Sequence, residues 1–442
     1  ERFLGLNHGE DQGKSDWGGM FLTEDQLEYA ALDVLHLHRL RDKQLEAITA
    51  EQLQTVLDLE NRLIPVVVEM ENRGFGINKE RLLGVMEDYS TELKKALDHF
   101  KKDFGEEINP NSPKQVKEAF VIKGLKLSNT SEQTLKEEDQ PLTACVLNYR
   151  SAKKQMEQAE TLLKAIEEDG RIHARFEPTG TDTGRFSSKK PNLQNIGRGK
   201  LRGCFAPADG SSLVVADYSQ VELRVAAVIA NEERMIEAYK NGEDLHRQTA
   251  SIVLGKPVED ISKEDRQLAK AVNFGLLYGQ SAKGLVGYAK KAYGVEMDDE
   301  RAQDIRGRFF SAYTGLWEWH KNARKMAAEG TQSVHTVLGR KRWLPEEKDA
   351  EWFRFVALLN TPVQGGSADA LKQAMVNLAD KLPNTASIVS TVHDELIVEC
   401  ASDTAEEVKV LVETAMLDAV QTMFPGVRFE VEAGICESWA EK

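Results

Sequence analysis

The chain of 442 residues has few of the residues and patterns that cross-link a fold or anchor it in a membrane. Its four cysteines lie far apart and never in C-x-x-C spacing, which argues against a disulfide framework or a zinc site and favours reduced thiols. The longest apolar runs, such as 63–68, are much shorter than the roughly 20 residues of a membrane helix. No repeat with a period of roughly 20 to 50 residues is visible. These absences favour an ordered globular protein over a membrane, disulfide-rich or solenoid class.

The chain also lacks an overall excess of basic residues. With 57 Lys and Arg against 72 Asp and Glu, its net charge is −15, which by itself argues against a polyanionic partner. The basic residues are nevertheless clustered: 185–202 holds six of them and no acid, and 321–342 repeats the imbalance with one acid. Two positive stripes on an acidic body suit a nucleic-acid channel, although two solvated loops would show the same charge pattern.

The length exceeds the roughly 250 to 300 residues at which one core stops growing, so two or more domains are expected. The first 168 residues predict long charged helices. A helix over 23–50 begins at Thr23, whose side chain can cap it together with Gln26. Further helices are predicted over 53–73, 79–102 and 140–168, separated by Gly74 and by the Pro-rich segment 109–113.

Strand patterns appear only after Gly170. Residues 172–176 alternate, 213–216 form a short apolar run, and 429–433 resemble a further strand. The runs 387–392 and 396–400 are separated by three residues and predict a tight hairpin. Helical patterns dominate from 232 to 328.

Two acids lie where such strands end. Asp217 follows the run 213–216, and Asp394 lies in the hairpin turn with Glu395 beside it. Adjacent strands would bring these carboxylates within reach of two metal ions roughly 3.5 to 4 Å apart, the arrangement used for phosphoryl transfer. Oxygen ligands at few positions favour Mg²⁺. Acids at strand ends are common, however, and by themselves also fit a solvent-exposed position.

A third group consists of Arg266, Lys270, Phe274 and Tyr278, spaced four residues apart. On a helix each such step advances by about 40°, so two cations and two rings would share one slowly turning ridge. A triphosphate fits the cationic half, and the rings can stack on a base or a sugar. An amphipathic helix with surface cations and core aromatics would show the same spacing.

Taken together, these segments resemble a known family. Residues 217–224 read DYSQVELR, 266–279 read RQLAKAVNFGLLYG and 392–395 read VHDE, which closely resemble motifs A, B and C of family A DNA polymerases, the bacterial DNA polymerase I type. TGRFSS at 183–188, PNLQNI at 191–196, NTPVQG at 360–365 and GICESW at 434–439 also match. The resemblance covers roughly 53–442 in consistent order.

The resemblance implies a role for each matching residue. Asp217 and Asp394 would bind the metals, with Glu395 a supporting acid. Lys270 would contact the triphosphate and protonate the departing pyrophosphate, while Arg266 and His246 would hold the distal phosphates. The remaining implied nucleotide contacts are Gln220, Glu222 as a gate against the ribose 2′-hydroxyl, Phe274 and Tyr278. The implied DNA contacts are Arg185, Asn192, Gln194, Asn195, Arg198, Asn360, Gln364 and His393.

The sequence departs from the family pattern in two places. Phe355-Val356 stands where the family commonly has Glu-Arg facing the template, and 197–200 is short and basic where the family continues with a longer loop. We therefore expect the contacts with the template and with the nearby duplex to differ from those of the family at these two places.

The N-terminal segment carries a separate resemblance. Tyr29-Ala-Ala-Leu-Asp33 is similar to the last motif of the family's 3′–5′ proofreading exonuclease. The paired acids of its other motifs are absent from this sequence. We expect 1–48 to be a C-terminal remnant of that domain, without proofreading activity; a capped helix with an incidental Asp is the alternative.

We accordingly predict a mostly helical α+β protein with a right-hand polymerase architecture. It would have a helical thumb near 75–168, a palm with an antiparallel sheet over 169–236 and 346–442, and helical fingers near 237–345, within a polymerase domain of 49–442. Its expected partners are primer-template DNA and deoxynucleotides, with two Mg²⁺, for which Mn²⁺ can substitute. We expect a monomer without membrane segments in the bacterial cytosol or nucleoid, or in the cytoplasm of a virus-infected host. A single-subunit RNA polymerase, a non-catalytic nucleic-acid-binding factor and a metal-dependent nuclease are the alternatives.

Overall fold

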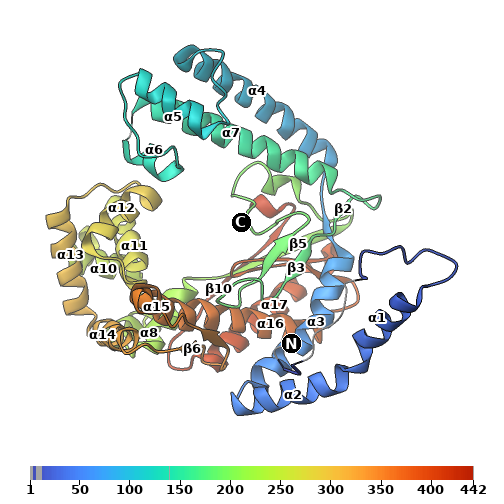
Figure 1. The fold of residues 1–442 in the computed structure, drawn as a ribbon. Coiled ribbons are helices and arrows are strands. Elements are labelled where there is room, and N and C mark those ends of the chain that lie inside the picture. The colour runs from blue at the N-terminus through green and yellow to red at the C-terminus, as the bar shows by residue number, and fades with distance from the viewer. Residues whose placement is uncertain (1–2, 6–11, 139, 442) are drawn as a thin grey trace.

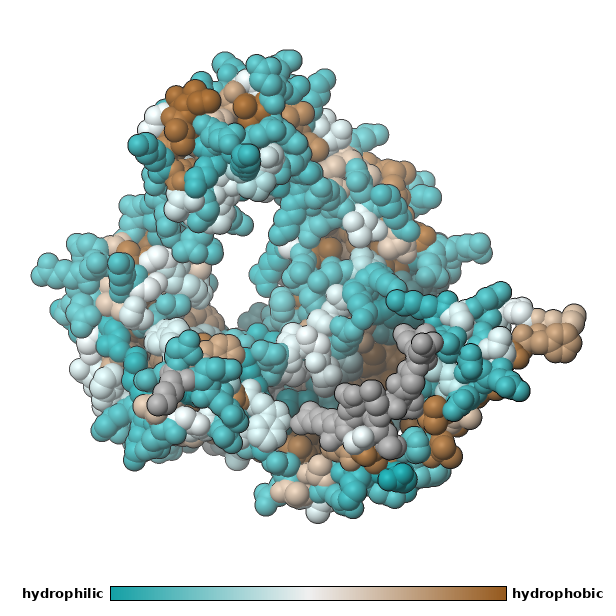
Figure 2. All heavy atoms as spheres, in the orientation of Figure 1, coloured by the Kyte–Doolittle hydropathy of each residue, from teal (hydrophilic) through white to brown (hydrophobic). Residues whose placement is uncertain are grey.

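The computed structural model describes residues 3–5, 12–138 and 140–441. Helical layers surround a small antiparallel sheet (Figure 1). Figure 2 shows an open hollow through the centre, bordered mostly by hydrophilic residues. Within the described residues no helix is both long and apolar enough to span a membrane.

The first helical segment differs from the expected single helix over 23–50. It divides into α1 (Glu24–Leu35) and α2 (Leu37–Ala50), because His36 leaves the helical conformation and ends α1. The predicted N-terminal cap is present, since Thr23 and Gln26 exchange hydrogen bonds in a capping box. The apolar residues of this segment stay largely exposed, including Leu27 at 55% and Leu35 at 65%.

Long helices follow close to the predicted ranges. They are α3 (Gln54–Arg73), α4 (Lys79–Phe104) and α7 (Pro141–Lys164), whereas the shorter helices α5 (Pro113–Ile122) and α6 (Glu132–Glu138) were not predicted. The long helices α4 and α7 pack along each other, and Figure 1 shows them above the central opening. A separate core around Phe100, Phe120 and Val146 holds this layer together. The other end of α4 and α7, at Leu82 and Leu162, packs into the main core with the sheet.

The central sheet has four antiparallel strands in the order β10-β5-β9-β8. Its strands are β5 (Ser211–Tyr218), β8 (Ala386–Val392), β9 (Glu395–Ala401) and β10 (Val431–Cys436). The helix α17 (Ala405–Met423) packs on β5 and β10, and α16 (Gly366–Ala379) packs on α17 and α3. The predicted hairpin over 387–400 is confirmed, and the strand predicted over 429–433 is shifted to begin at Val431.

The single strand predicted over 172–176 is wrong. β2 (Arg171–Ile172) pairs with β1 (Phe75–Gly76), whereas β3 (Arg175–Glu177) pairs with β4 (Ser187–Lys189) in another sheet. Glu71 accounts for the division: its carbonyl oxygen hydrogen-bonds the His173 ring, and its carboxylate accepts the backbone N–H of Phe176. These bonds replace ladder hydrogen bonds at the break.

A second helical layer lies across the opening from α4 and α7. Its helices are α8 (Val221–Ile229), α9 (Glu233–Lys240), α10 (Leu245–Leu254), α11 (Lys263–Leu277), α12 (Ala282–Tyr293), α13 (Asp299–Ala312) and α14 (Thr314–Ala328). A hairpin of β6 (Ser333–His335) and β7 (Lys341–Trp343) then leads to α15 (Glu351–Asn360). The mostly helical α+β class and the right-hand arrangement are thus confirmed, while the subdomain boundaries remain predictions.

Candidate active site

A cleft of about 560 Å³ lies where the sheet meets the helices α8, α10 and α11. Nine of the sequence-predicted site residues line it together, drawn from five separate segments of the chain. They are Arg198, Asp217, Gln220, Glu222, His246, Arg266, Lys270, Phe274 and Asp394. A cleft that combines acids on one side with cations on the other can hold both metal ions and phosphates.

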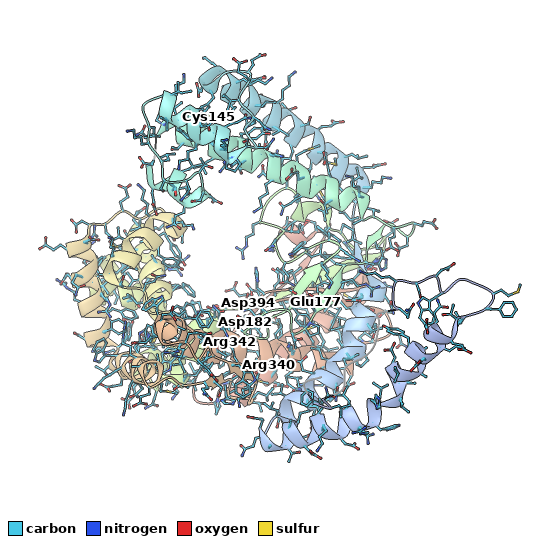
Figure 3. The ribbon with its side chains drawn as sticks, in the orientation of Figure 1. Cys145, Glu177, Asp182, Arg340, Arg342 and Asp394 are labelled. Carbon is cyan, nitrogen blue, oxygen red and sulfur yellow. The ribbon has the colours of Figure 1, made fainter. Side chains whose placement is uncertain are left out.

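The register of the sheet brings the two acids together. Strands β5 and β9 pair so that Asp217 lies directly opposite Glu395. Val392 pairs with Glu395, so His393 and Asp394 form a two-residue turn, and His393 takes the left-handed conformation typical of such turns at φ 58°. Asp394 therefore enters the cleft one residue before the position opposite Asp217. Figure 3 places it at the edge of the central opening.

The electrostatics of Asp394 fit a cation-binding role. Burial, and then the negative charge of Asp217, raise the pKa of the Asp394 carboxyl to about 7 from its usual 3.8. Two half-buried carboxylates that oppose each other's ionisation would gain from the charge of a bound divalent cation. Across the described residues no cluster of three or more Asp, Glu, His or Cys is arranged to bind a metal. The protein would thus supply few oxygens and leave water and phosphate to complete the shell, as Mg²⁺ prefers.

Glu395 is held in place by residues far away in the sequence. The indole N–H of Trp439 donates to its Oε1 at 2.5 Å, and Arg202 approaches the same atom at 3.4 Å. The Arg202 guanidinium in turn lies 4.0 Å from the Trp439 ring centroid. The family resemblance marked GICESW as a match without a role; the structure shows that its Trp fixes the acid next to Asp394.

The predicted ridge forms on α11, which ends at Leu277 so that Tyr278 caps it. The Nε of Arg266 donates to Asp244 Oδ2 at 2.7 Å. Asp244 also accepts the backbone N–H groups of His246 and Arg247 as the N-cap of α10. One carboxylate therefore sets both the start of the helix that carries His246 and the position of Arg266. The sequence analysis missed Asp244, although its place before an apolar helical run is a capping signal.

His246 is 3% exposed, and burial, followed by the positive charge of Arg266, lowers its pKa to about 4. It is therefore neutral at pH 7. Its Nδ1 lies 2.9 Å from the side-chain nitrogen of Asn273, and its ring faces that of Phe274 at 6.1 Å between centroids. A neutral imidazole at this position can still donate one hydrogen bond to a phosphate oxygen.

Glu222 connects three residues for which separate roles were predicted. It accepts hydrogen bonds from the Tyr278 hydroxyl and from Arg185. Burial, and then Glu222, raise the pKa of Tyr278 well above its usual value. Arg185 and Tyr278 are thus both engaged with Glu222. The sequence alone gave no sign of this contact.

The predicted DNA-contact residues of the segment 192–198 differ in burial. Gln194 is buried, and its amide donates to Thr391 O at 2.6 Å and accepts from His393 N at 3.1 Å, so it braces the hairpin turn that carries Asp394. Its predicted DNA contact stays a prediction. Asn192, Asn195 and Arg198, on either side of Gln194, are exposed.

The segment 360–365 forms a local widening of the helix that the sequence did not predict. Thr361–Gly365 is a π-helical turn between α15 and α16, a feature frequent at functional sites. Gln364 lies on it and hydrogen-bonds Tyr278. A Cβ on Gly365 would lie 2.9 Å from the carbonyl oxygen of Thr183, so glycine allows this turn to pack against the TGRFSS loop. Asn360 precedes the turn.

Two further lining residues were missed. Glu432, opposite Asp217 on β10, and Tyr293, at the end of α12, both line the cleft. Gln220 lines it in a left-handed conformation at φ 52° and accepts from the Tyr239 hydroxyl at 3.3 Å. Only the register of β10 reveals Glu432.

Tyr29 and Asp33 lie on α1, outside the central opening in Figure 1. Asp33 is exposed and Tyr29 packs near the ring of Trp17, at 6.2 Å between centroids. The structure does not bring this pair to the cleft.

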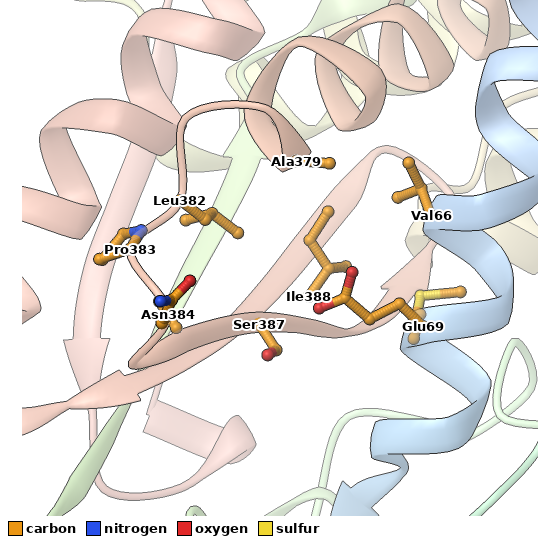
Figure 4. A pocket seen from close by; sticks show the side chains of 10 residues that line it. Val66, Glu69, Ala379, Leu382, Pro383, Asn384, Ser387 and Ile388 are labelled. Atoms are coloured by element: carbon orange, nitrogen blue, oxygen red, sulfur yellow. The ribbon is translucent and has the colours of Figure 1, made fainter.

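A second cavity of about 250 Å³ lies between α3 and β8, on the side of Val66 and Ile388 (Figure 4). None of the sequence-predicted site residues lines it. Glu69 is the one ionisable side chain among its described lining residues, so it offers no pair of groups for catalysis.

Comparisons with known proteins agree with the family resemblance of the residues that line the cleft. The family model of DNA polymerase family A matches residues 79–441. The DNA polymerase I of Aquifex aeolicus is 37% identical over 99% of this chain and 80% of that protein. The DNA polymerase I of Caldicellulosiruptor bescii is 34% identical over 93% of this chain but only 50% of that protein, so the chain spans about half of such relatives.

One solved structure is described as the POL domain of Pol1 from M. smegmatis in complex with DNA primer-template and dNTP. It superposes with a TM-score of 0.81 at 29% identity, covering 94% of this chain and 74% of that one.

Proposed function

The chain belongs to DNA polymerase family A, whose members are DNA-directed DNA polymerases, and on that premise we propose that its cleft adds deoxynucleotides to a primer 3′ end with release of pyrophosphate. The observation that carries this proposal is the meeting of Asp217 and Asp394 with Arg266 and Lys270 in one cleft. Neither pair alone would indicate nucleotidyl transfer.

Asp217 and Asp394 would hold two Mg²⁺, which when bound supply the positive charge that a reacting phosphate requires. Mn²⁺ would substitute because it accepts the same oxygen ligands. Glu395 would act as the supporting acid, held at the turn by its contact with Trp439.

The cations of α11 would bind the triphosphate. Lys270 donates to its phosphate oxygens and can pass a proton to the departing pyrophosphate, while Arg266 and His246 hold the distal phosphates. Because the cations are fixed on helices before substrate arrives, they stabilise developing charge without reorganisation. Asp244 keeps Arg266 pointed into the same cleft.

The sugar and the duplex would be bound by the neighbouring residues. Glu222 and Phe274 limit space at the sugar and exclude a 2′-hydroxyl. Arg185, Gln364 and His393 would contact the minor groove of the primer terminus, where all correct pairs present similar acceptors. Arg185 must leave Glu222 to do so, which links duplex binding to the gate. Arg198, Asn192 and Asn195 would contact the backbone.

We also propose that the protein works as a monomer in the cytoplasm on primer-template DNA. Primer extension of a labelled duplex tests the assignment. Asp217→Ala should abolish Mg²⁺-dependent extension and leave duplex binding nearly unchanged, because it removes a metal ligand and no DNA contact. Asp403→Asn, at an exposed acid outside the cleft, is the control and should extend normally. Retained extension by Asp217→Ala would overturn the two-metal assignment.

A single-subunit RNA polymerase is the second candidate, because a metal-binding sheet would serve it equally. Glu222 lines the cleft beside Phe274, which favours deoxynucleotides. Equal extension with ribonucleotides and deoxynucleotides would favour the RNA polymerase.

A further inference from the structure

A buried chain of hydrogen bonds runs behind His246, away from the cleft. Asn273 Nδ2 lies 2.9 Å from His246 Nδ1, and Asn273 Oδ1 accepts from the Thr249 hydroxyl at 2.9 Å. Thr249 Oγ1 in turn lies 2.9 Å from the hydroxyl of Tyr313. Asn273 and Thr249 are fully buried, and Tyr313 is 1% exposed. The helices α10 and α11, and the residue that joins α13 to α14, thus contribute to one polar line inside the protein core.

The hydrogen bonds of this line all donate in one direction, from Tyr313 toward His246. The single proton of the Thr249 hydroxyl is given to Asn273 Oδ1, so the Tyr313 hydroxyl must donate to Thr249 Oγ1. The Asn273 amide then faces His246 with its N–H. That N–H requires a bare nitrogen as its acceptor, so His246 Nδ1 carries no proton. The ring proton of a neutral His246 is therefore on Nε2.

The charged groups around His246 explain why the position of its ring proton affects phosphate binding. Its ring meets Arg266 and Lys270 from α11, with Asp244 at the start of its own helix. Tyr313, which caps α13, is linked to His246 through Thr249 and Asn273. Burial and the two cations keep the imidazole neutral at pH 7. A neutral ring with a bare Nε2 would turn a lone pair toward bound phosphate oxygens, which is repulsive, whereas an Nε2–H donates to them.

We propose that Asn273 is a positioning residue: it fixes His246 as the neutral Nε2–H tautomer, so that the ring donates a hydrogen bond to the triphosphate at every pH at which the enzyme works. This inference rests on the proposed function, because it assumes that a nucleoside triphosphate lies against Arg266 and Lys270. Thr249 and Tyr313 extend the role by preventing rotation of the Asn273 amide.

The variant Asn273→Asp reverses the chemistry at one atom. A carboxylate accepts the Thr249 hydroxyl as before but cannot donate to Nδ1, so it stabilises an Nδ1–H. At low pH the ring is then an imidazolium that still donates from Nε2. Once the ring loses its proton at higher pH, the proton that remains is on Nδ1 and Nε2 is bare. The KM for the deoxynucleotide should therefore rise about tenfold across pH 6 to 9 relative to the unsubstituted enzyme, the size expected for one charge-assisted hydrogen bond.

Matched variants separate this effect from damage to the fold. Asn377→Asp makes the same change on α16, where the side chain accepts a hydrogen bond from Gln373. The ratio of the KM of this variant to the KM of the unsubstituted enzyme should not change with pH. The double variant His246→Gln with Asn273→Asp should also be flat, since Gln does not titrate. Thr249→Ser keeps the hydroxyl and should behave as the unsubstituted enzyme, whereas Thr249→Val frees the amide to rotate and should raise KM.

Nitrogen and carbon NMR of the labelled imidazoles gives a readout that does not depend on activity, with His246→Gln assigning the resonance. The unsubstituted protein should show the Nε2–H tautomer, and Asn273→Asp the Nδ1–H tautomer above its pKa. An Nδ1–H tautomer in the unsubstituted protein would overturn the proposal, as would a pH-independent loss of kcat in Asn273→Asp. If instead the unsubstituted enzyme showed no Mg²⁺-dependent extension at all, the proposed function would fail, while the tautomer would still be measured.

Discussion

Replacing Asp394 by Asn should make the folded protein more stable while it removes activity. Asp394 is half-buried beside Asp217, and desolvation with the charge of Asp217 raises the pKa of its carboxyl to about 7, against 3.8 ordinarily. An acid whose folded pKa is raised binds its proton more tightly in the folded state, so the ionised form weakens folding. The loss of folding stability begins as the pH rises above about 4, where the carboxyl of the unfolded chain ionises. This loss is complete above about pH 7, where the carboxyl of the folded protein is ionised as well.

The magnitude follows from the difference between these two pKa values. A difference of about three corresponds to up to about 4 kcal/mol above pH 7, and to about 2 kcal/mol at pH 5. An Asn of the same shape carries no charge and avoids this cost. The free energy of unfolding of Asp394→Asn should therefore exceed that of the unsubstituted protein most at pH 8 and least near pH 4.

Urea unfolding at pH 5 and pH 8, without divalent cations, measures this difference. Asp403→Asn serves as the exposed control and should change stability by less than about 0.5 kcal/mol at either pH. Adding Mg²⁺ should raise the melting temperature of the unsubstituted protein, because the ion binds only the folded carboxylate pair, and should do little for Asp394→Asn. A variant that is less stable than the unsubstituted protein at pH 8 would refute the argument from charge repulsion.

Two further predictions concern residues that support the site. Trp439→Phe keeps the ring packing on Phe75 and Phe205 but removes the N–H that is donated to Glu395. It should lower the free energy of unfolding, measured in urea, by about 1 to 3 kcal/mol and should slow primer extension. An unchanged extension rate would count against a role of Trp439 at the turn. Arg340 forms ion pairs with the fully buried Asp369 and with Glu60, and Figure 3 labels it near Asp182 and Arg342. Arg340→Met should lower the free energy of unfolding by about 3 to 5 kcal/mol, because it leaves Asp369 with an uncompensated charge. Arg342→Gln is its control: it breaks an ion pair to Asp182, which is 76% exposed, and should cost under about 1 kcal/mol.

Features that depend on neighbouring residues were predictable from the sequence. The capping box at Thr23, the hairpin at 387–400 and the four-residue spacing along α11 all arise from interactions within one element, so their patterns are visible in the order of residues. The motif order added the expectation that Asp217, Asp394 and Lys270 would meet. They do line one cleft.

Predictions failed where a distant residue competed with a local preference. The strand over 172–176 is divided because Glu71, about a hundred positions earlier, takes the hydrogen bonds at its middle. The sequence likewise did not predict that the amide of Gln194 would hydrogen-bond the hairpin nearly two hundred residues later. Local pattern carries no information on such partners.

The sequence by itself thus determined the chemical groups of this protein: strand-end carboxylates, a helix ridge of cations and rings, and a histidine that the motifs place at the phosphates. Only the tertiary structure decided which of them are free to act. The register of β5 against β9 sets Asp217 opposite Glu395, Trp439 restrains that glutamate, and Asn273 determines which nitrogen of His246 bears the proton. The physical reason is that ionisation, tautomer and hydrogen-bond direction depend on burial and on the nearest partner in space, and folding brings those partners from distant parts of the chain.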